Sequence, residues 1–171
     1  MGQRHVPARE RPCRARSSAL GGFIGDNVDV NVERTGSIAR GDELLARFRE
    51  LVDVTPWRHP PVWVHGDLHA ANMLARDVGG GVRISAVIDW GDVCACDPAT
   101  DLSVAWSLFD ADVRAVLRAA ASASEFGVDD ATWQRGHAWA VRFAIMYERH
   151  SADNPTMAAI GSRLVASLLD G

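Results

Sequence analysis

Three oxygen-bearing side chains stand out in this 171-residue chain, because their types and spacing could bind a metal ion. Asp67 follows a short β-prone run at residues 62–64, Asn72 lies five residues later, and Asp89 follows another β-prone run. Carboxylate and amide oxygens are hard ligands that suit Mg²⁺ better than zinc. A carboxylate that does not bind the metal could act as a general base toward a hydroxyl group. Metal-assisted phosphoryl transfer requires this combination.

A β-hairpin is expected to bring these side chains together. The segments 72–76 and 82–88 are β-prone, and a run of three glycines lies in the turn between them. Hairpin geometry places Asn72 and Asp89 at the same end of the two strands, next to the loop that carries Asp67. We therefore expect the two carboxylates and the amide to converge on one cleft.

The chain after the hairpin is predicted to be helical, which gives an α+β fold that is mainly helical. Aspartate or asparagine at the start of each apolar-periodic segment indicates an N-cap, and proline follows two of these caps. We expect helix caps at Asp42, Asp97, Asp110, Asp129 or Asp130, and Asn154. The helices predicted from these caps end near Val52, Phe109, Phe126, His150 and Leu169.

Three linked motifs resemble those of one family. Residues 65–72, HGDLHAAN, resemble the H-G-D-x-x-x-x-N catalytic loop of aminoglycoside phosphotransferases and their choline-kinase-like relatives. Residues 88–92, IDWGD, resemble the metal-binding segment of that family, and residues 97–102, DPATDL, resemble the opening of the helix that follows. The resemblance covers roughly residues 40–171. It implies a protein-kinase-like fold with a small β-hairpin at the catalytic site, of which this chain would form the C-terminal lobe.

By this resemblance the protein would be a small-molecule kinase that uses ATP or GTP with Mg²⁺. Asp67 would deprotonate the substrate hydroxyl, while Asn72 and Asp89 would hold the Mg²⁺ ions that bridge the nucleotide phosphates. His65 would brace the catalytic loop. The acceptor would be an aminoglycoside-like antibiotic, a macrolide, choline or another small alcohol, which suggests a role in antibiotic resistance.

Other polar residues near the motifs are expected to have structural roles. Asp97 and Asp101 would support the following helix as N-terminal caps that its dipole favours. His69 is interpreted as a loop residue and not as a ligand. Asp92 could either support the metal site from nearby or lie at the surface.

The tryptophans are interpreted mainly as core residues. Trp90 is expected in the core, and Trp106, Trp133 and Trp139 occur at helical spacing that is typical of buried positions. The second interpretation of these last three residues is an aromatic surface for a cationic, sugar-like ligand.

Charge is distributed unevenly along the chain. Residues 1–20 carry five arginines against one glutamate, so their net charge is +4, whereas the whole chain carries −4. The remaining residues therefore carry −8, which argues against a nucleic-acid partner and suits a cationic small molecule or simple solubility. The sequence offers no secretory signal and no membrane span, and the three cysteines lack zinc or redox-motif spacing, so we expect a cytoplasmic protein without a membrane partner.

The nucleotide-binding N-terminal lobe of the family is expected to be absent from this chain. Residues 1–22 have the composition of a disordered basic leader, which leaves residues 23–171 for the C-terminal lobe. The chain has no lysine, so it lacks the residue with which the family grips the nucleotide phosphates. We expect a fragment or a natural short form that depends on a missing lobe or associates with itself.

Two other functions fit parts of the pattern. A catalytically dead pseudoenzyme would explain the missing lobe, although Asp67, Asn72 and Asp89 are all present. A metallophosphoesterase would use the G-D-x-H pattern at residues 66–69. That family needs further metal-ligand motifs, which do not occur after Asp89.

Overall fold

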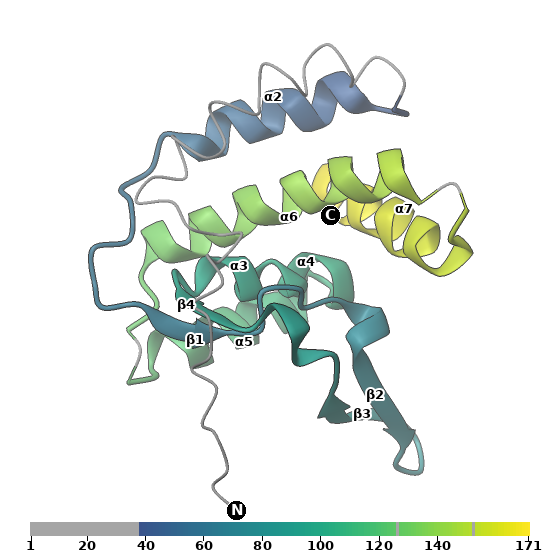
Figure 1. Ribbon diagram of the computed structural model, residues 1–171, viewed down its shortest axis with the longest axis horizontal. Coiled ribbons are helices and arrows are strands. Elements are labelled where there is room, and N and C mark those ends of the chain that lie inside the picture. The colour runs from purple at the N-terminus through teal and green to yellow at the C-terminus, as the bar shows by residue number, and fades with distance from the viewer. Residues whose placement is uncertain (1–37, 126, 152) are drawn as a thin grey trace, which may run out of the picture.

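The computed structural model describes residues 38–125, 127–151 and 153–171, so the expected leader at residues 1–22 lies outside the described residues. Two antiparallel strand pairs lie beside a set of packed helices (Figure 1). In chain order the elements are α2 (Gly41–Val52), β1 (Val62–Val64), β2 (Met73–Asp77), β3 (Val82–Val87), β4 (Cys94–Cys96), α3 (Ala99–Leu102), α4 (Val104–Leu108), α5 (Ala111–Ser122), α6 (Asp130–His150) and α7 (Pro155–Leu169), with 3-10 turns at Ala70–Asn72 and Trp90–Asp92. The expected mainly helical α+β fold is confirmed.

Helix α6 is the centre of the core. It lies between α2 and the layer formed by α3 and α4, and it also packs against α7 (Figure 1). Small residues allow this close packing: a Cβ atom added at Gly136 of α6 would lie 3.0 Å from the Cβ of Leu102. Helix α2 turns one apolar face toward α6, on which Leu44, Leu45 and Phe48 are buried.

The expected hairpin is present, with β2 and β3 paired antiparallel from Met73 opposite Val87 to Asp77 opposite Val82. A second pair was not predicted: β1 runs antiparallel to β4, with Val64 opposite Cys94. Strand β4 is only three residues long, too short for a periodic signal in the sequence. The β1–β4 pair holds the segment before residue 65 and the segment after residue 92 side by side.

The predicted helices are present at their approximate positions, but the described residues form six helices where five were predicted, and three corrections follow. The helix expected from Asp97 to Phe109 is divided into α3 and α4 at Ser103, whose hydroxyl donates to the carbonyl of Thr100 at 2.6 Å. The N-cap of α2 is Arg40, with φ of 60°, so Asp42 lies in the first turn and does not cap the helix.

The third correction is that α5 ends at Ser122 and not near residue 126.

The tryptophan predictions are confirmed for three residues and wrong for one. Trp106, Trp133 and Trp139 are buried in the core. Trp90 is 56% exposed. Its indole N–H donates to the carbonyl of Val87 at 3.0 Å, so the ring lies across the end of the hairpin and not inside the helical core.

A buried ion pair joins α6 to the start of α3. The guanidinium of Arg135 is 2% exposed and donates to the carboxylate of Asp97 at 2.6 Å. Arg135 also donates to the carbonyl of Thr55 at 2.6 Å and to the hydroxyl of Thr132 at 2.9 Å. Asp97 also accepts from the N–H of Ala99 at 3.0 Å, but the N-cap position of α3 is Pro98 and not Asp97 as expected. Among the described residues, no helix combines the length and apolar character needed to cross a membrane.

Removing Arg135 should destabilise the fold strongly, because it would leave the half-buried carboxylate of Asp97 without its counter-charge. We expect Arg135→Met to lower the free energy of unfolding by about 3–5 kcal/mol, measured by urea denaturation. Arg47→Met is the matched control, since Arg47 pairs with Glu50 at the surface and should contribute less than about 1 kcal/mol. Equal losses in the two variants would contradict this role.

Stability should fall on acidification because of His137. Its ring stacks on Trp106 with centroids 4.6 Å apart, and burial, followed by the charges of Arg47 and Arg114, lowers the pKa of His137 from 6.5 to about 4. The unfolded chain therefore takes up a proton that the folded chain does not, and the contribution present above pH 6.5 is lost as the pH falls toward 4. Urea denaturation across this pH range should show a smaller acid loss for His137→Phe, while exposed His150→Gln follows the wild type. Parallel pH profiles for the wild type and His137→Phe would contradict the prediction.

Candidate active site

His65 fixes the loop that follows β1. Its ring is buried, and Nε2–H donates to the carbonyl of Ile88 at 2.9 Å. Its Nδ1 accepts from the main-chain N–H of Asp67 at 3.3 Å. The imidazole therefore joins the main chain of the loop to the residue immediately before Asp89.

Asp101 holds the same loop from the helical side. Its carboxylate accepts from the main-chain N–H of His65 at 2.7 Å and from that of Gly66 at 3.0 Å. Burial raises the pKa of Asp101, and these two hydrogen bonds oppose the rise. We expected Asp101 to cap a helix; instead it lies in the first turn of α3 and reaches back to the loop.

Gly66 brings the loop against the segment that follows the hairpin. Its φ is +84°, and a Cβ atom added here would lie 2.6 Å from the carbonyl oxygen of Asp92. Both the backbone conformation and the close approach require glycine.

Asn72 connects the two motifs. Its side-chain N–H donates to the carbonyl of Asp67 at 2.9 Å, and its own carbonyl accepts from the N–H of Ile88 at 2.9 Å. Because the amide nitrogen is used in this way, the amide oxygen is the atom that remains for a cation. In the described part of the chain, no group of three or more His, Cys, Asp or Glu side chains could hold a metal ion, so a metallophosphoesterase-like ligand set is not found there.

Asp89 has a strained backbone at the end of the hairpin. Its φ is 60°, and among the described residues only Arg40 is another non-glycine residue with positive φ. This conformation costs a non-glycine residue roughly 1–2 kcal/mol, and such strain is concentrated at functional sites. The side chain of Asp89 is exposed to solvent.

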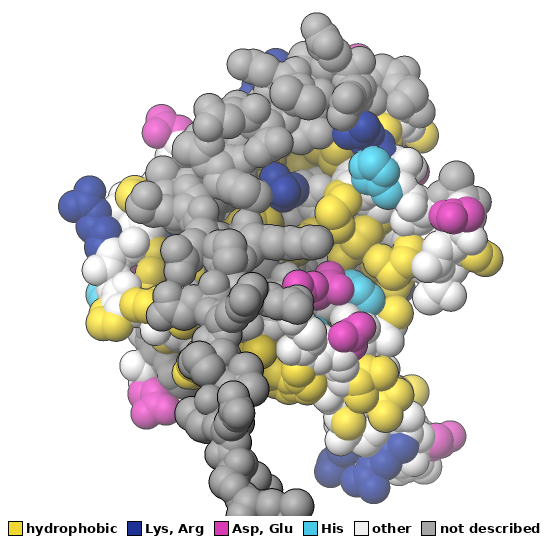
Figure 2. All heavy atoms as spheres, in the orientation of Figure 1, with side chains coloured by type: hydrophobic (Ala, Val, Ile, Leu, Met, Phe, Trp, Pro, Cys, Tyr) yellow, Lys and Arg dark blue, Asp and Glu magenta, His cyan; other side chains and the backbone are white. Residues whose placement is uncertain are grey.

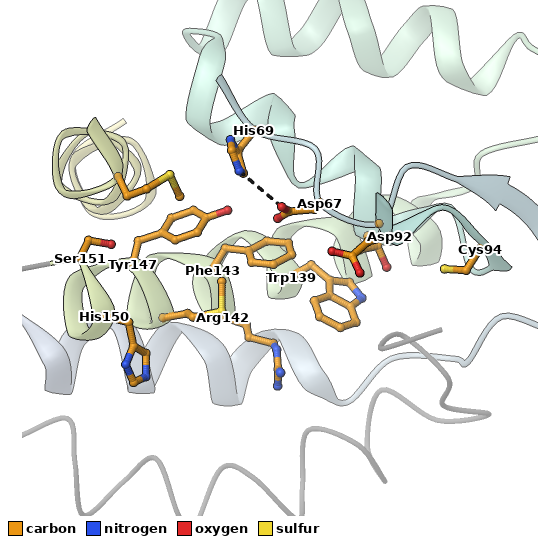
Figure 3. Close-up of a pocket in the computed structure, with 14 residues that line it drawn as sticks. Asp67, His69, Asp92, Cys94, Trp139, Arg142, Phe143, Tyr147, His150 and Ser151 are labelled. Carbon is orange, nitrogen blue, oxygen red and sulfur yellow. Dashed lines mark ion pairs between the residues drawn. The ribbon is translucent and has the colours of Figure 1, made fainter. Parts of the chain in front are cut away.

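A cavity of about 450 Å³ opens beside the loop (Figure 3). Asp67 and Asp92 contribute carboxylates to it, and the Nε2 atom of His69 lies 3.6 Å from a carboxylate oxygen of Asp67. The space-filling view of Figure 2 shows acidic, histidine and hydrophobic side chains next to one another on one face of the molecule. The other lining residues are Gly66, Cys94, Thr100, Trp139, Arg142, Phe143, Met146, Tyr147, His150, Ser151 and Met157.

One side of this cavity is an aromatic wall on α6 formed by Trp139, for which a ligand surface was our second interpretation, and by Phe143 and Tyr147, which we did not predict. Successive rings are in contact, with centroid distances of 5.7 Å and 5.8 Å. The four-residue spacing of these aromatic residues places them on one face of a helix. That spacing is the sequence signal that could have identified the wall.

The structure therefore brings the predicted site residues into one network of main-chain contacts. His65 and Asn72 both bond to Ile88, the residue before Asp89, and both also contact Asp67. Asp67 lines the cavity, whereas Asn72 and Asp89 are not among the lining residues. The convergence of all three side chains on one cleft remains a prediction.

Comparison with known proteins shows which family and which relative this chain is similar to. The family model described as "Phosphotransferase enzyme family" (APH) matches residues 21–139. Viomycin phosphotransferase of Streptomyces vinaceus is 41% identical over 63 residues, which cover 37% of this chain and 22% of that protein. The similar stretch thus spans about a fifth of this relative. No solved structure gives a significant match.

Replacing Gly66 should damage the site more than replacing a glycine in open space. We expect Gly66→Ala to lower the free energy of unfolding by about 3 kcal/mol, from roughly 1–2 kcal/mol of backbone strain and at least about 1 kcal/mol of overpacking. Gly79→Ala is the matched control, because Gly79 has φ of +74° and nothing within 4 Å of an added Cβ atom. Urea denaturation measures both changes, and equal losses would show that the contact with Asp92 contributes nothing.

Proposed function

The chain belongs to the phosphotransferase enzyme family, and from this premise we propose that it transfers the γ-phosphate of ATP to a hydroxyl group of a small molecule. One observation carries this proposal: the loop that contains Asp67 is fixed at His65 and Gly66 and opens at a cavity of small-molecule size. Residues 38–171 would form the C-terminal lobe of a kinase-like fold.

Asp67 would act as the general base. Its carboxylate lines the cavity, where it could accept the proton of the acceptor hydroxyl while the hydroxyl oxygen attacks phosphorus. His65 would keep the carboxylate in position through its hydrogen bonds to the main chain of Asp67 and Ile88. Positioning of this kind supplies much of the rate enhancement in phosphoryl transfer.

Asn72 and Asp89 would hold Mg²⁺. The amide oxygen of Asn72 is the atom left by its hydrogen bond to Asp67, and the strained backbone of Asp89 supports a functional role for that residue. A bound Mg²⁺ would neutralise charge on the phosphates. Asp89 is exposed and is not among the residues that line the cavity, so a nucleotide bound there through Mg²⁺ would not need to occupy the acceptor pocket.

We propose an antibiotic-like alcohol as the acceptor. Similarity to viomycin phosphotransferase supports an antibiotic, and the carboxylates of Asp67 and Asp92 beside the aromatic wall would suit a cationic molecule. Viomycin and an aminoglycoside such as kanamycin are therefore the first acceptors to test.

Substitutions at the two aspartates should separate the base from the metal ligand. Asp67→Asn should lower kcat for phosphoryl transfer by about 10²–10⁴-fold with little change in Mg·ATP affinity, because it removes the base. Asp89→Asn should weaken Mg·ATP binding as well. Phosphorylation assays and calorimetric titration with Mg·ATP would measure both effects, with exposed Asp112→Asn as the control.

The assays should use this chain alone and joined behind the nucleotide-binding lobe of a family member. A larger loss of Mg·ATP affinity in Asp67→Asn than in Asp89→Asn would reverse the assignment of roles. Mg·ATP binding without phosphoryl transfer to any acceptor, in both forms of the protein, would favour a catalytically dead member of the family.

A further inference from the structure

Tyr147 is held rigidly in the wall of the cavity. The residue is 6% exposed, and its ring stacks on Phe143 at an interplanar angle of 11°. The ring of His69 meets it edge-on, with centroids 6.1 Å apart. Gly161 of α7 fits against its backbone side, where an added Cβ atom would lie 3.0 Å from the Cβ of Tyr147. Contacts from α6, from the loop at His69 and from α7 thus hold this tyrosine in place.

The hydroxyl of Tyr147 is directed toward the catalytic loop. In Figure 3 its oxygen points toward Asp67 across the cavity. Among the described residues this hydroxyl has no hydrogen-bond partner, and it is not one of the fully enclosed polar atoms, so it is accessible from the cavity. Burial raises the pKa of Tyr147, and the negative charge of Asp67 raises it further. The phenol therefore stays protonated and keeps its hydrogen available as a donor.

From this geometry we infer that Tyr147 positions the acceptor by donating a hydrogen bond to a second oxygen or nitrogen next to the reacting hydroxyl. The acceptor class is then a molecule with two neighbouring heteroatoms, such as a vicinal diol or amino alcohol. This inference rests on the proposed function, since it takes the cavity as the acceptor site.

The chemistry of the cavity favours two contacts on the same molecule. One substrate hydroxyl donates its proton toward Asp67, and the neighbouring heteroatom accepts from Tyr147. The C–H face of a ring between them packs on the aromatic wall, which continues from Tyr147 through Phe143 to Trp139. An acceptor with a single hydroxyl can bond to Asp67 but forms no hydrogen bond with the phenol O–H, so it lacks the contribution of that second contact.

The test compares two neutral probes, trans-1,2-cyclohexanediol and cyclohexanol, by saturation-transfer NMR titration of this chain. The wild type should prefer the diol by roughly two- to tenfold, the range expected for one hydrogen bond. Tyr147→Phe keeps the ring contacts and removes only the hydroxyl, so it should abolish the preference and still bind cyclohexanol. Phe143→Leu is the matched control, because it should weaken both probes and retain the preference.

Equal binding of the two probes by the wild type, no binding of either, or a preference that persists in Tyr147→Phe would overturn the inference. The kinetic test uses viomycin with the Asp67→Asn and Tyr147→Phe variants. We expect Tyr147→Phe to raise the KM for viomycin and leave the KM for Mg·ATP unchanged. A Tyr147-dependent preference for the diol without any phosphoryl transfer would support the binding role and contradict the proposed function alone.

Discussion

The two hydrogen bonds that Asp101 accepts from His65 and Gly66 are the contacts on which the arrangement of the site depends. They fix two successive N–H groups of an irregular loop to the first turn of α3. Helix α3 packs against α6, where the added Cβ at Gly136 would already meet Leu102. The loop that contains Asp67 is thereby attached to the helical core as well as to the β1–β4 strand pair. Burying the carboxylate is unfavourable by itself, and the two N–H donors offset part of that cost.

This anchoring explains how the site can maintain unfavourable backbone conformations. Gly66 and Asp89 both have positive φ, on opposite sides of the contact between the loop and the end of the hairpin. Residues in such conformations persist only where surrounding structure over-determines them. Here His65 and Asn72 supply this constraint, because each bonds to Ile88 and to the main chain of Asp67. The loop that contains Asp67 and the segment that contains Asp89 therefore share structural contacts, and the effects of substitutions in the two segments should not be additive.

Features that depend on a few neighbouring residues could be predicted from the sequence, and features that depend on contacts between distant residues could not. Asp110, Asp129 and Asn154 cap helices as expected, because each accepts a hydrogen bond from an N–H three residues later. The hairpin also follows from its glycine turn. The β1–β4 pair and the long-range partners of Asp101 could not be predicted, since neither leaves a periodic pattern. Trp90 was misassigned because a large aromatic residue is usually buried, whereas here its N–H is satisfied locally at the surface.

Two different parts of helix α6 make two different kinds of contact. Near its start, Arg135 holds α3 and the segment before β1 through buried polar contacts, so changes there affect the whole fold. Toward its end, the wall from Trp139 to Tyr147 faces the cavity and packs mainly through ring contacts. Ring contacts tolerate exchange among side chains of similar volume better than a buried ion pair tolerates loss of one partner. The lining of the cavity can therefore vary at the end of α6 while Asp101, His65 and Asn72 keep the loop that contains Asp67 in place.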